Sequence, residues 1–162
     1  MNWKKNLNPL SRGIVRTSDK MKGSTNSTGI DAVGDFCDVY LTEDKTVNVG
    51  ANWTNSAIYT LRNSRGSSIS FLSGYLFTIN KAGTYLAIIC NRHDSSNFGG
   101  SGINVSTGIF AEATTSLSNT PVVNFLTFYA SAGTTVSIQQ YGDQGTLVSY
   151  SSLNHCSIQR IA

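Results

Sequence analysis

The chain has 162 residues, enough for one domain with a core of its own and a terminal extension. Charged residues make up only 13% of the sequence and Pro occurs twice, whereas Ser, Thr, Asn and Gly are abundant. No stretch approaches the roughly 18 apolar residues of a membrane span, no window is convincingly amphipathic as a helix, and the N-terminus lacks the apolar segment of a signal peptide. Short apolar runs bounded by Gly, Asn and Ser instead predict an all-β protein.

The positive charge is concentrated at the N-terminus. The first 22 residues contain six of the 12 cations and one acid, Asp19, whereas residues 23–162 contain six cations and eight acids. Residues 23–29, GSTNSTG, have the composition of a flexible linker. We therefore divide the chain into a basic arm with its Gly/Ser/Thr/Asn linker, residues 1–34, and a folded domain, residues 35–162.

The arm mixes apolar and cationic side chains. Such a segment rarely orders alone, so it is either a disordered tail or an anchor that orders against a partner. In the second interpretation its apolar side chains fill grooves while its cations meet acidic groups. Nucleic acid is not the partner we expect, because Trp3 is the only aromatic residue and no basic run exceeds two residues. The predicted docking residues are Trp3, Lys4, Lys5, Leu7, Leu10, Arg12, Ile14, Arg16, Lys20 and Lys22.

The domain contains about eight to ten candidate strands. Apolar and β-branched residues recur with connections of a few residues, a pattern typical of two packed antiparallel sheets. A polar, Gly-rich loop is expected at residues 91–102, with Gly99-Gly100 as its most flexible point, and a turn at residues 62–66. The predicted strands are 36–41, 46–49, 57–61, 67–72, 75–79, 84–90, 103–113, 121–130, 134–141 and 147–161.

Residues 74–90, GYLFTINKAGTYLAIIC, give the strongest local signal. They predict a hairpin in which Lys81-Ala82-Gly83 turns the chain and Gly83 supplies a positive φ. The outgoing strand is apolar on both faces, with Tyr85, Ala87 and Ile89 on one side. A strand of this kind has to be covered on both sides, by a second sheet or by another subunit.

No motif points to catalysis or to a bound cofactor. Cys37, Cys90 and Cys156 cannot all pair within one chain, so reduced and mostly buried thiols are expected. Cys90 and His93 have zinc-ligand spacing, but the adjacent His155 and Cys156 would point to opposite faces of a strand, and we predict no metal site. No nucleophile elbow, carboxylate pair or phosphate-binding loop occurs.

Four motifs, in order, resemble the tumour necrosis factor and complement globular-head superfamily. FTI at 77–79 followed by AGTYL at 82–86 is similar to its F-x-I/V-x-x-x-G-x-Y signature, and AGTTVSI at 132–138 is similar to its later L-x-x-G-D-x-V-x-V element. Residues 151–158 occupy the place of the closing strand, and residues 48–59 resemble the G-x-W-T opening of phage fibre-head and decoration versions. Thr134 stands where the family has Asp and Leu153 where it has Phe, so a calcium role is not supported.

The resemblance implies a ten-strand antiparallel jelly-roll β-sandwich that trimerises through aromatic-rich strand faces. Aromatic side chains bury ~150–250 Å² each, so three copies meeting on an axis would cover a large apolar surface. The alternative is that the same side chains fill the core of the sandwich. The predicted trimer residues are Tyr85, Phe125, Phe128, Tyr129 and Tyr141.

The favoured function is a non-enzymatic, trimeric decoration or cement protein of a virus, most simply a bacteriophage. It would be made in the host cytoplasm, lie on the capsid surface and be anchored by its arm to the major capsid protein or another virion protein. One alternative is the receptor- or glycan-binding head of a fibre or spike, and a second is a small jelly-roll coat protein. The loop residues predicted to meet a receptor or glycan are Asn91, Arg92, His93, Asp94, Asn97, Phe98, Ser116 and Asn119.

Overall fold

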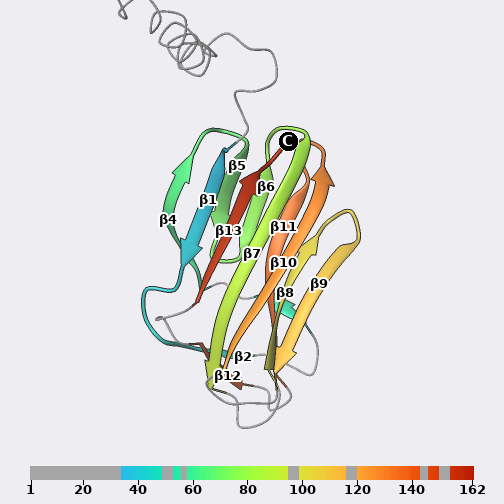
Figure 1. The fold of residues 1–162 in the computed structure, drawn as a ribbon. Coiled ribbons are helices and arrows are strands. Elements are labelled where there is room, and N and C mark those ends of the chain that lie inside the picture. Colours follow the sequence, from blue (N-terminus) through green and yellow to red (C-terminus); the bar gives the residue numbers. More distant parts are fainter. Residues whose placement is uncertain are drawn as a thin grey trace, which may run out of the picture. The chain divides into compact units, whose positions relative to one another are not determined.

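A computed structural model describes residues 34–48, 53–55, 58–94, 99–115, 120–142, 146–149 and 154–162 of the chain, with backbone only for 45–48, 93–94 and 146–149. These ranges hold thirteen strands and no helix, hence no helix that could cross a membrane. Every strand pairing is antiparallel, and the strands form two layers (Figure 1). The predicted all-β sandwich is confirmed, and the predicted arm, apart from Gly34, lies outside the described residues.

The first layer is a seven-stranded sheet. Its strands follow the order β2-β12-β7-β13-β1-β4, and β10 pairs with β7 beside this path. β7 is therefore the central strand of the layer, and β4 and β10 are edge strands. The bounds are β1 Phe36–Tyr40, β2 Lys45–Asn48, β4 Thr60–Arg65, β7 Gly83–Asp94, β10 Pro121–Ala130, β12 Thr146–Ser149 and β13 His155–Arg160.

The second layer is a six-stranded sheet. Its strands follow the order β5-β6-β11-β8-β9, with the short β3 paired to the far half of β11. The bounds are β3 Thr54–Asn55, β5 Ile69–Ser73, β6 Leu76–Ile79, β8 Gly99–Val105, β9 Ile109–Thr115 and β11 Thr135–Gly142.

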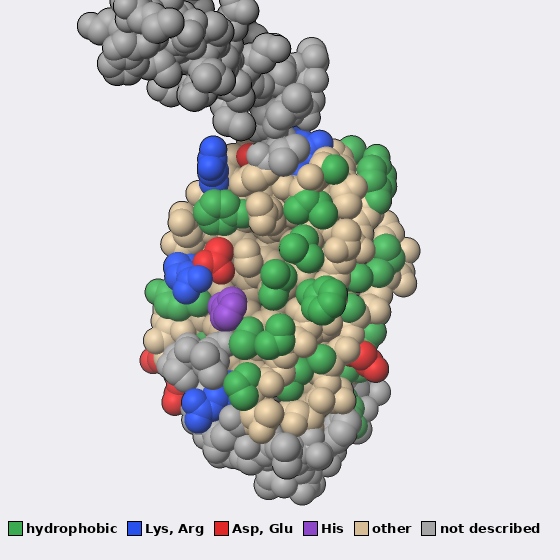
Figure 2. Space-filling model, viewed as in Figure 1, with side chains coloured by type: hydrophobic (Ala, Val, Ile, Leu, Met, Phe, Trp, Pro, Cys, Tyr) green, Lys and Arg blue, Asp and Glu red, His purple; other side chains and the backbone are tan. Residues whose placement is uncertain are grey.

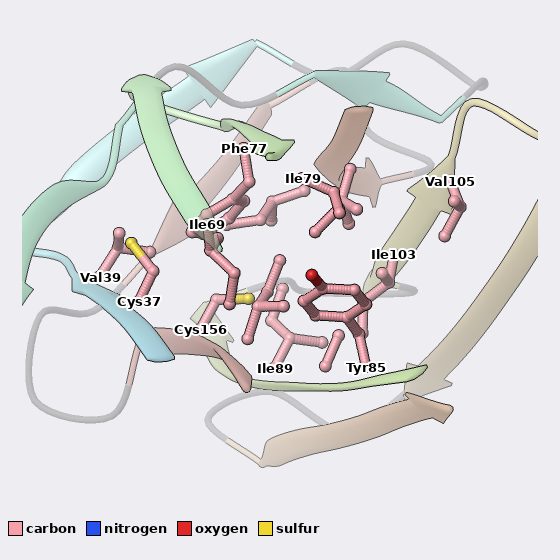
Figure 3. Packing of buried hydrophobic residues seen from close by; sticks show 14 of the residues in the cluster. Cys37, Val39, Ile69, Phe77, Ile79, Tyr85, Ile89, Ile103, Val105 and Cys156 are labelled. Carbon is pink, nitrogen blue, oxygen red and sulfur yellow. The ribbon is translucent and has the colours of Figure 1, made fainter. Parts of the chain in front are cut away.

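The hydrophobic core lies between the two sheets (Figure 3). Side chains from β1, β7 and β13 meet those from β5, β6, β8 and β11, because alternate residues of each strand point inward. Tyr85 of β7 is fully buried and stacks on Phe128 of β10, with ring centroids 5.9 Å apart. The Tyr85 hydroxyl donates a hydrogen bond of 2.5 Å to the carbonyl of Lys81, so its polar end is satisfied inside the fold.

The predicted hairpin at residues 74–90 is wrong, although both of its strands exist. β6 pairs with β5 and β11 in the second sheet, whereas β7 pairs with β10, β12 and β13 in the first. Lys81 and Ala82 thus carry the chain from one layer to the other. Gly83 is not among the glycines with a positive φ; it is required because an added Cβ would lie 2.4 Å from the carbonyl oxygen of Ala162.

Four other predictions of strands and connections are revised. Gly99 to Gly102 belong to the buried strand β8 instead of an exposed loop, and the run 103–113 divides at Gly108, whose φ is +92°. The predicted turn at 62–66 is mostly strand, because β4 extends to Arg65. The predicted final strand, 147–161, is two strands, β12 and β13. The polar and Gly-rich composition of these segments did not predict strands, because the strands are stabilised by pairing with segments that are distant in the sequence.

Candidate interaction surfaces

β10 turns an apolar face outward. Its even-numbered residues, such as Asn124 and Phe128, point into the fold, while Val123, Phe125 and Tyr129 are 58%, 70% and 64% exposed. Large apolar side chains at this exposure normally occur singly on a protein surface. Three such side chains on one face of one strand form an exposed apolar patch, and patches of this kind commonly mark interaction sites.

β7 continues the same face. In the antiparallel register Val123 lies opposite Cys90, Phe125 opposite Ile88 and Tyr129 opposite Thr84. Ile88 is 37% exposed, and directly opposite residues on one face of a sheet are in contact distance. Hydrophobic side chains run down the middle of this side of the domain (Figure 2). We call the set Leu86, Ile88, Val123, Phe125 and Tyr129 the β10 face.

The structure divides the five predicted trimer residues. Tyr85 and Phe128 are core residues of the single chain, 0% and 3% exposed, so their prediction as subunit contacts is corrected: β7 and β10 point these two side chains inward. Phe125 and Tyr129 lie on the outer side. Tyr141 is half-buried on β11, in the other sheet. The alternating pattern of residues 122–129, VVNFLTFY, predicts that Phe125 and Phe128 lie on opposite faces of the strand. It does not show which of the two faces is turned to the core.

Tyr141 belongs to an aromatic cluster that the sequence reading missed. The ring of Trp53 lies 5.2 Å from that of Phe110 and 5.6 Å from that of Tyr141. The rings cover Gly100 and Gly102 of β8, where an added Cβ would come within 3.0 Å of the Trp53 ring and 2.6 Å of the Phe110 ring, respectively. Two glycines two residues apart on one strand are the signal that a bulky group approaches that face.

Hydrogen bonds to β13 hold the residues that precede β1. Gly34 N–H donates to the Arg160 carbonyl at 3.0 Å, and Arg160 N–H donates to the Asp35 carbonyl at 2.8 Å. The buried carboxylate of Asp35 accepts hydrogen bonds from both the N–H and the hydroxyl of Ser68 and from the N–H of Ser67. Burial alone would raise the pKa of Asp35, but these bonds and the charge of Lys81 hold it below its ordinary value.

The strands that border two of the predicted ligand segments, 95–98 and 116–119, end at the opposite end of the domain. There Gly99 pairs with Thr115 and Arg92 pairs with Pro121. Asn97, Phe98, Ser116 and Asn119 lie outside the described residues. Of His93 and Asp94 only the backbone is described, at the end of β7.

Asn91 is not a surface ligand residue, contrary to the prediction. It is fully buried, accepts a 2.5 Å hydrogen bond from the Tyr59 hydroxyl and donates one of 2.5 Å to the Ser101 hydroxyl. Burial raises the pKa of Tyr59, which is therefore a neutral donor. The neighbouring Arg92 is half-buried, and its backbone N–H and carbonyl both bond the side chain of Asn154. This polar network joins the two sheets and presents no reactive group to solvent.

Two of the three thiols, those of Cys37 and Cys156, are buried, and that of Cys90 is half-buried. Burial, aided by the charge of Asp38, raises the pKa of Cys37 to about 11, and burial raises that of Cys156 further. His155 lies opposite Cys90 in the register while Cys156 points into the core, as expected for adjacent strand residues. Within the described part of the chain, no group of three His, Cys, Asp or Glu side chains could hold a metal ion.

Comparisons with known proteins agree on the fold. No protein-family model matches the chain, and no curated protein sequence matches it. Among solved structures, Eiger TNF from S. frugiperda has a TM-score of 0.61 at 10% identity, covering 80% of this chain and 94% of its own. The fold is the jelly roll of the tumour necrosis factor and complement heads.

Two further structures carry this jelly roll outside the tumour necrosis factor group. The globular domain of zebrafish complement 1qA has a TM-score of 0.61 at 10% identity, covering 79% of this chain and 98% of its own. The PRD1 vertex protein P5, from a phage, has a TM-score of 0.57 at 10% identity, covering 80% of this chain and 99% of its own. The predicted family resemblance is therefore confirmed at the level of fold.

Proposed function

We propose that this chain is a non-enzymatic virion protein: a homotrimeric capsid decoration or cement protein whose arm, residues 1–34, docks on the major capsid protein or another virion protein. The observation that carries the proposal is the β10 face, because a soluble sandwich that exposes Phe125 at 70% and Tyr129 at 64% on one strand needs a protein partner. The jelly roll shared with a phage vertex protein supports placing that partner in a virion.

A threefold arrangement suits the β10 face. Around a threefold axis each subunit contacts its neighbour with two different surfaces, so the β10 face packs against another part of the next copy. β10 is an edge strand and lies at the margin of its sheet, where it can reach a neighbouring subunit without opening the sandwich. In this arrangement the side chains of Phe125 and Tyr129 contact the neighbouring subunit.

The function is tested by deleting residues 1–34. We expect the shortened protein to remain a soluble trimer and to lose binding to capsids that lack the decoration protein, measured by co-sedimentation. The trimer persists because the contacts of the β10 face lie within residues 86–129. Capsid binding by the shortened protein at full affinity would contradict the role of the arm.

A second candidate function is a glycan- or receptor-binding head. It is favoured because the strands that border the segments 95–98 and 116–119 all end at the end of the domain opposite Gly34. Binding to a glycan array that is lost when these two segments are replaced, and kept when the arm is removed, would favour this function over decoration.

A further inference from the structure

β10 is a long edge strand that lacks the usual protection of an edge. It has ten residues, PVVNFLTFYA, none of them charged, and among the described strands it pairs with β7 alone. The backbone N–H and C=O groups on its other side therefore have no partner strand in the described part of the chain. β4, at another margin of the same sheet, has six residues and carries Arg62 and Arg65, and charged side chains of this kind discourage further pairing.

β9, the edge strand of the second sheet, lies close to β10 and is only partly covered by the first sheet (Figure 1). Its residues Ile109, Ala111 and Ala113 pair with three buried residues of β8, so they point toward the first sheet as those do. The three β8 residues are at most 1% exposed, whereas Ile109 is 38% exposed and the two Ala residues are half-buried. Because the first sheet ends at β10, a strand added beside β10 would cover these β9 residues.

Asn124 brings an unsatisfied hydrogen-bond donor to the inner side of β10. It is 8% exposed, and its Nδ2 is buried without a hydrogen-bond partner in the described part of the chain. A buried donor without an acceptor costs about 1–3 kcal/mol. Neighbouring residues on one face of two paired strands have Cβ atoms about 4.5–5.5 Å apart, so a polar side chain on an added strand would be within reach of this amide.

We propose that the free edge of β10 binds an extended segment of a partner protein, which adds to the first sheet as a further strand. Only a polypeptide has N–H and C=O groups that alternate at the spacing of a strand edge, so the ligand is neither nucleic acid, glycan nor lipid. One side of the segment would lie beside Val123 and Phe125 of the β10 face. The other side would cover Ala111 and Ala113, with a hydrogen-bond acceptor opposite Asn124. The segment is therefore uncharged and mostly apolar.

A second copy of this chain suits the edge of β10 less well. Pairing of β10 with β10 of another copy would join two copies about a twofold axis, whereas the proposed assembly has three copies. This choice of occupant rests on the proposed function, but the edge itself does not, because the proposed trimer uses the outer face of β10. The edge is thus a second interaction surface on the same strand.

The test uses the full-length chain and a fluorescently labelled peptide as long as β10, titrated by fluorescence anisotropy. The peptide has Val at alternate positions, Ala between them, one central Ser and Lys at both ends. The control peptide has the same sequence with its central residues N-methylated, which prevents backbone pairing on both of its edges. We expect the parent protein to bind the first peptide and not to bind the control peptide at millimolar concentration.

Ala113→Asp and Thr114→Asp form a matched pair of variants. They add the same charge one residue apart on β9, the first on the side that faces the added strand and the second on the exposed side. We expect Ala113→Asp to bind the first peptide roughly tenfold more weakly than Thr114→Asp, because its carboxylate would lose water beside the bound strand. The unfolding temperatures of both variants show whether either substitution has disturbed the fold.

Three results would overturn the inference. The first is that the parent protein does not bind the first peptide, and the second is that it binds both peptides equally. The third is equal binding of the first peptide by the two folded variants. If the peptide does not bind and Ala113→Asp alone lowers the mass of the protein in solution, another copy of the chain covers this margin. The trimer of the proposed function then stands and only the inference fails.

Discussion

At the scale of single residues, the hydrogen bonds of the Asp35 carboxylate require that residue 66 is Gly. Gly66 has a φ of +78°, and a Cβ added there would lie 1.8 Å from Oδ1 of Asp35. The carboxylate occupies this space because it accepts the hydrogen bonds of Ser67 and Ser68, which connect the turn after β4 to the start of β1. Any side chain at position 66 would displace a buried carboxylate from its donors.

Gly133 provides a matched control for this position. Its φ is +89°, but no atom lies within 4 Å of an added Cβ. We expect Gly133→Ala to lower the free energy of unfolding by about 1 kcal/mol through backbone strain alone. Gly66→Ala should lower it by about 1–3 kcal/mol more, because the Asp35 bonds are lost as well. Urea unfolding of both variants measures the difference, and equal losses would contradict the role given to Asp35.

At the scale of an element, β10 supplies a matched pair of Phe residues on its two faces. Phe128 is 3% exposed and packs on Tyr85, so Phe128→Ala should cost about 3–5 kcal/mol of stability. Phe125 is 70% exposed in the single chain, so Phe125→Asp should change the stability of the isolated subunit by less than about 0.5 kcal/mol.

The two substitutions should also differ in their effect on assembly. Phe125→Asp would place a charge in the proposed subunit contact, so the mass in solution should fall to that of one chain with the β circular dichroism spectrum retained. An unchanged mass for Phe125→Asp would remove Phe125 from the subunit contact.

Part of the strand arrangement could be predicted from the sequence. Alternation correctly placed strands at residues 36–40, 76–79 and 121–130, because apolar period-2 runs are local signals. It failed for the pairing of β6 and β7, since a tight connection does not reveal whether two strands share a sheet or face each other across the core. It failed again for Gly99 to Gly102, because a strand covered by Trp53 and Phe110 needs small residues that read as a loop.

The candidate site was predictable in part for the same reasons. Phe125 and Tyr129 were predicted from composition and resemblance, but Ile88 and Val123 join them only through the cross-strand register. Asn91 was assigned to a polar loop because Asn is common there, and only the tertiary fold reveals its buried bonds to Tyr59 and Ser101.

At the scale of the whole molecule, the proposed assembly depends on how the exposed apolar side chains are placed on the domain. The domain has an apolar side on β7 and β10 and two ends, one at Gly34 and the other where the strands that border residues 95–98 and 116–119 end. In the proposed trimer, closing the apolar side around a threefold axis leaves both ends of each domain uncovered and turns the same end of all three subunits the same way.

The most direct measurement is the mass of the purified full-length protein by light scattering. We expect three times the chain mass of 17.4 kDa at micromolar concentration, because trimerisation would cover the β10 face. A mass of one chain that persists as the concentration is raised would contradict the trimer and the function built on it.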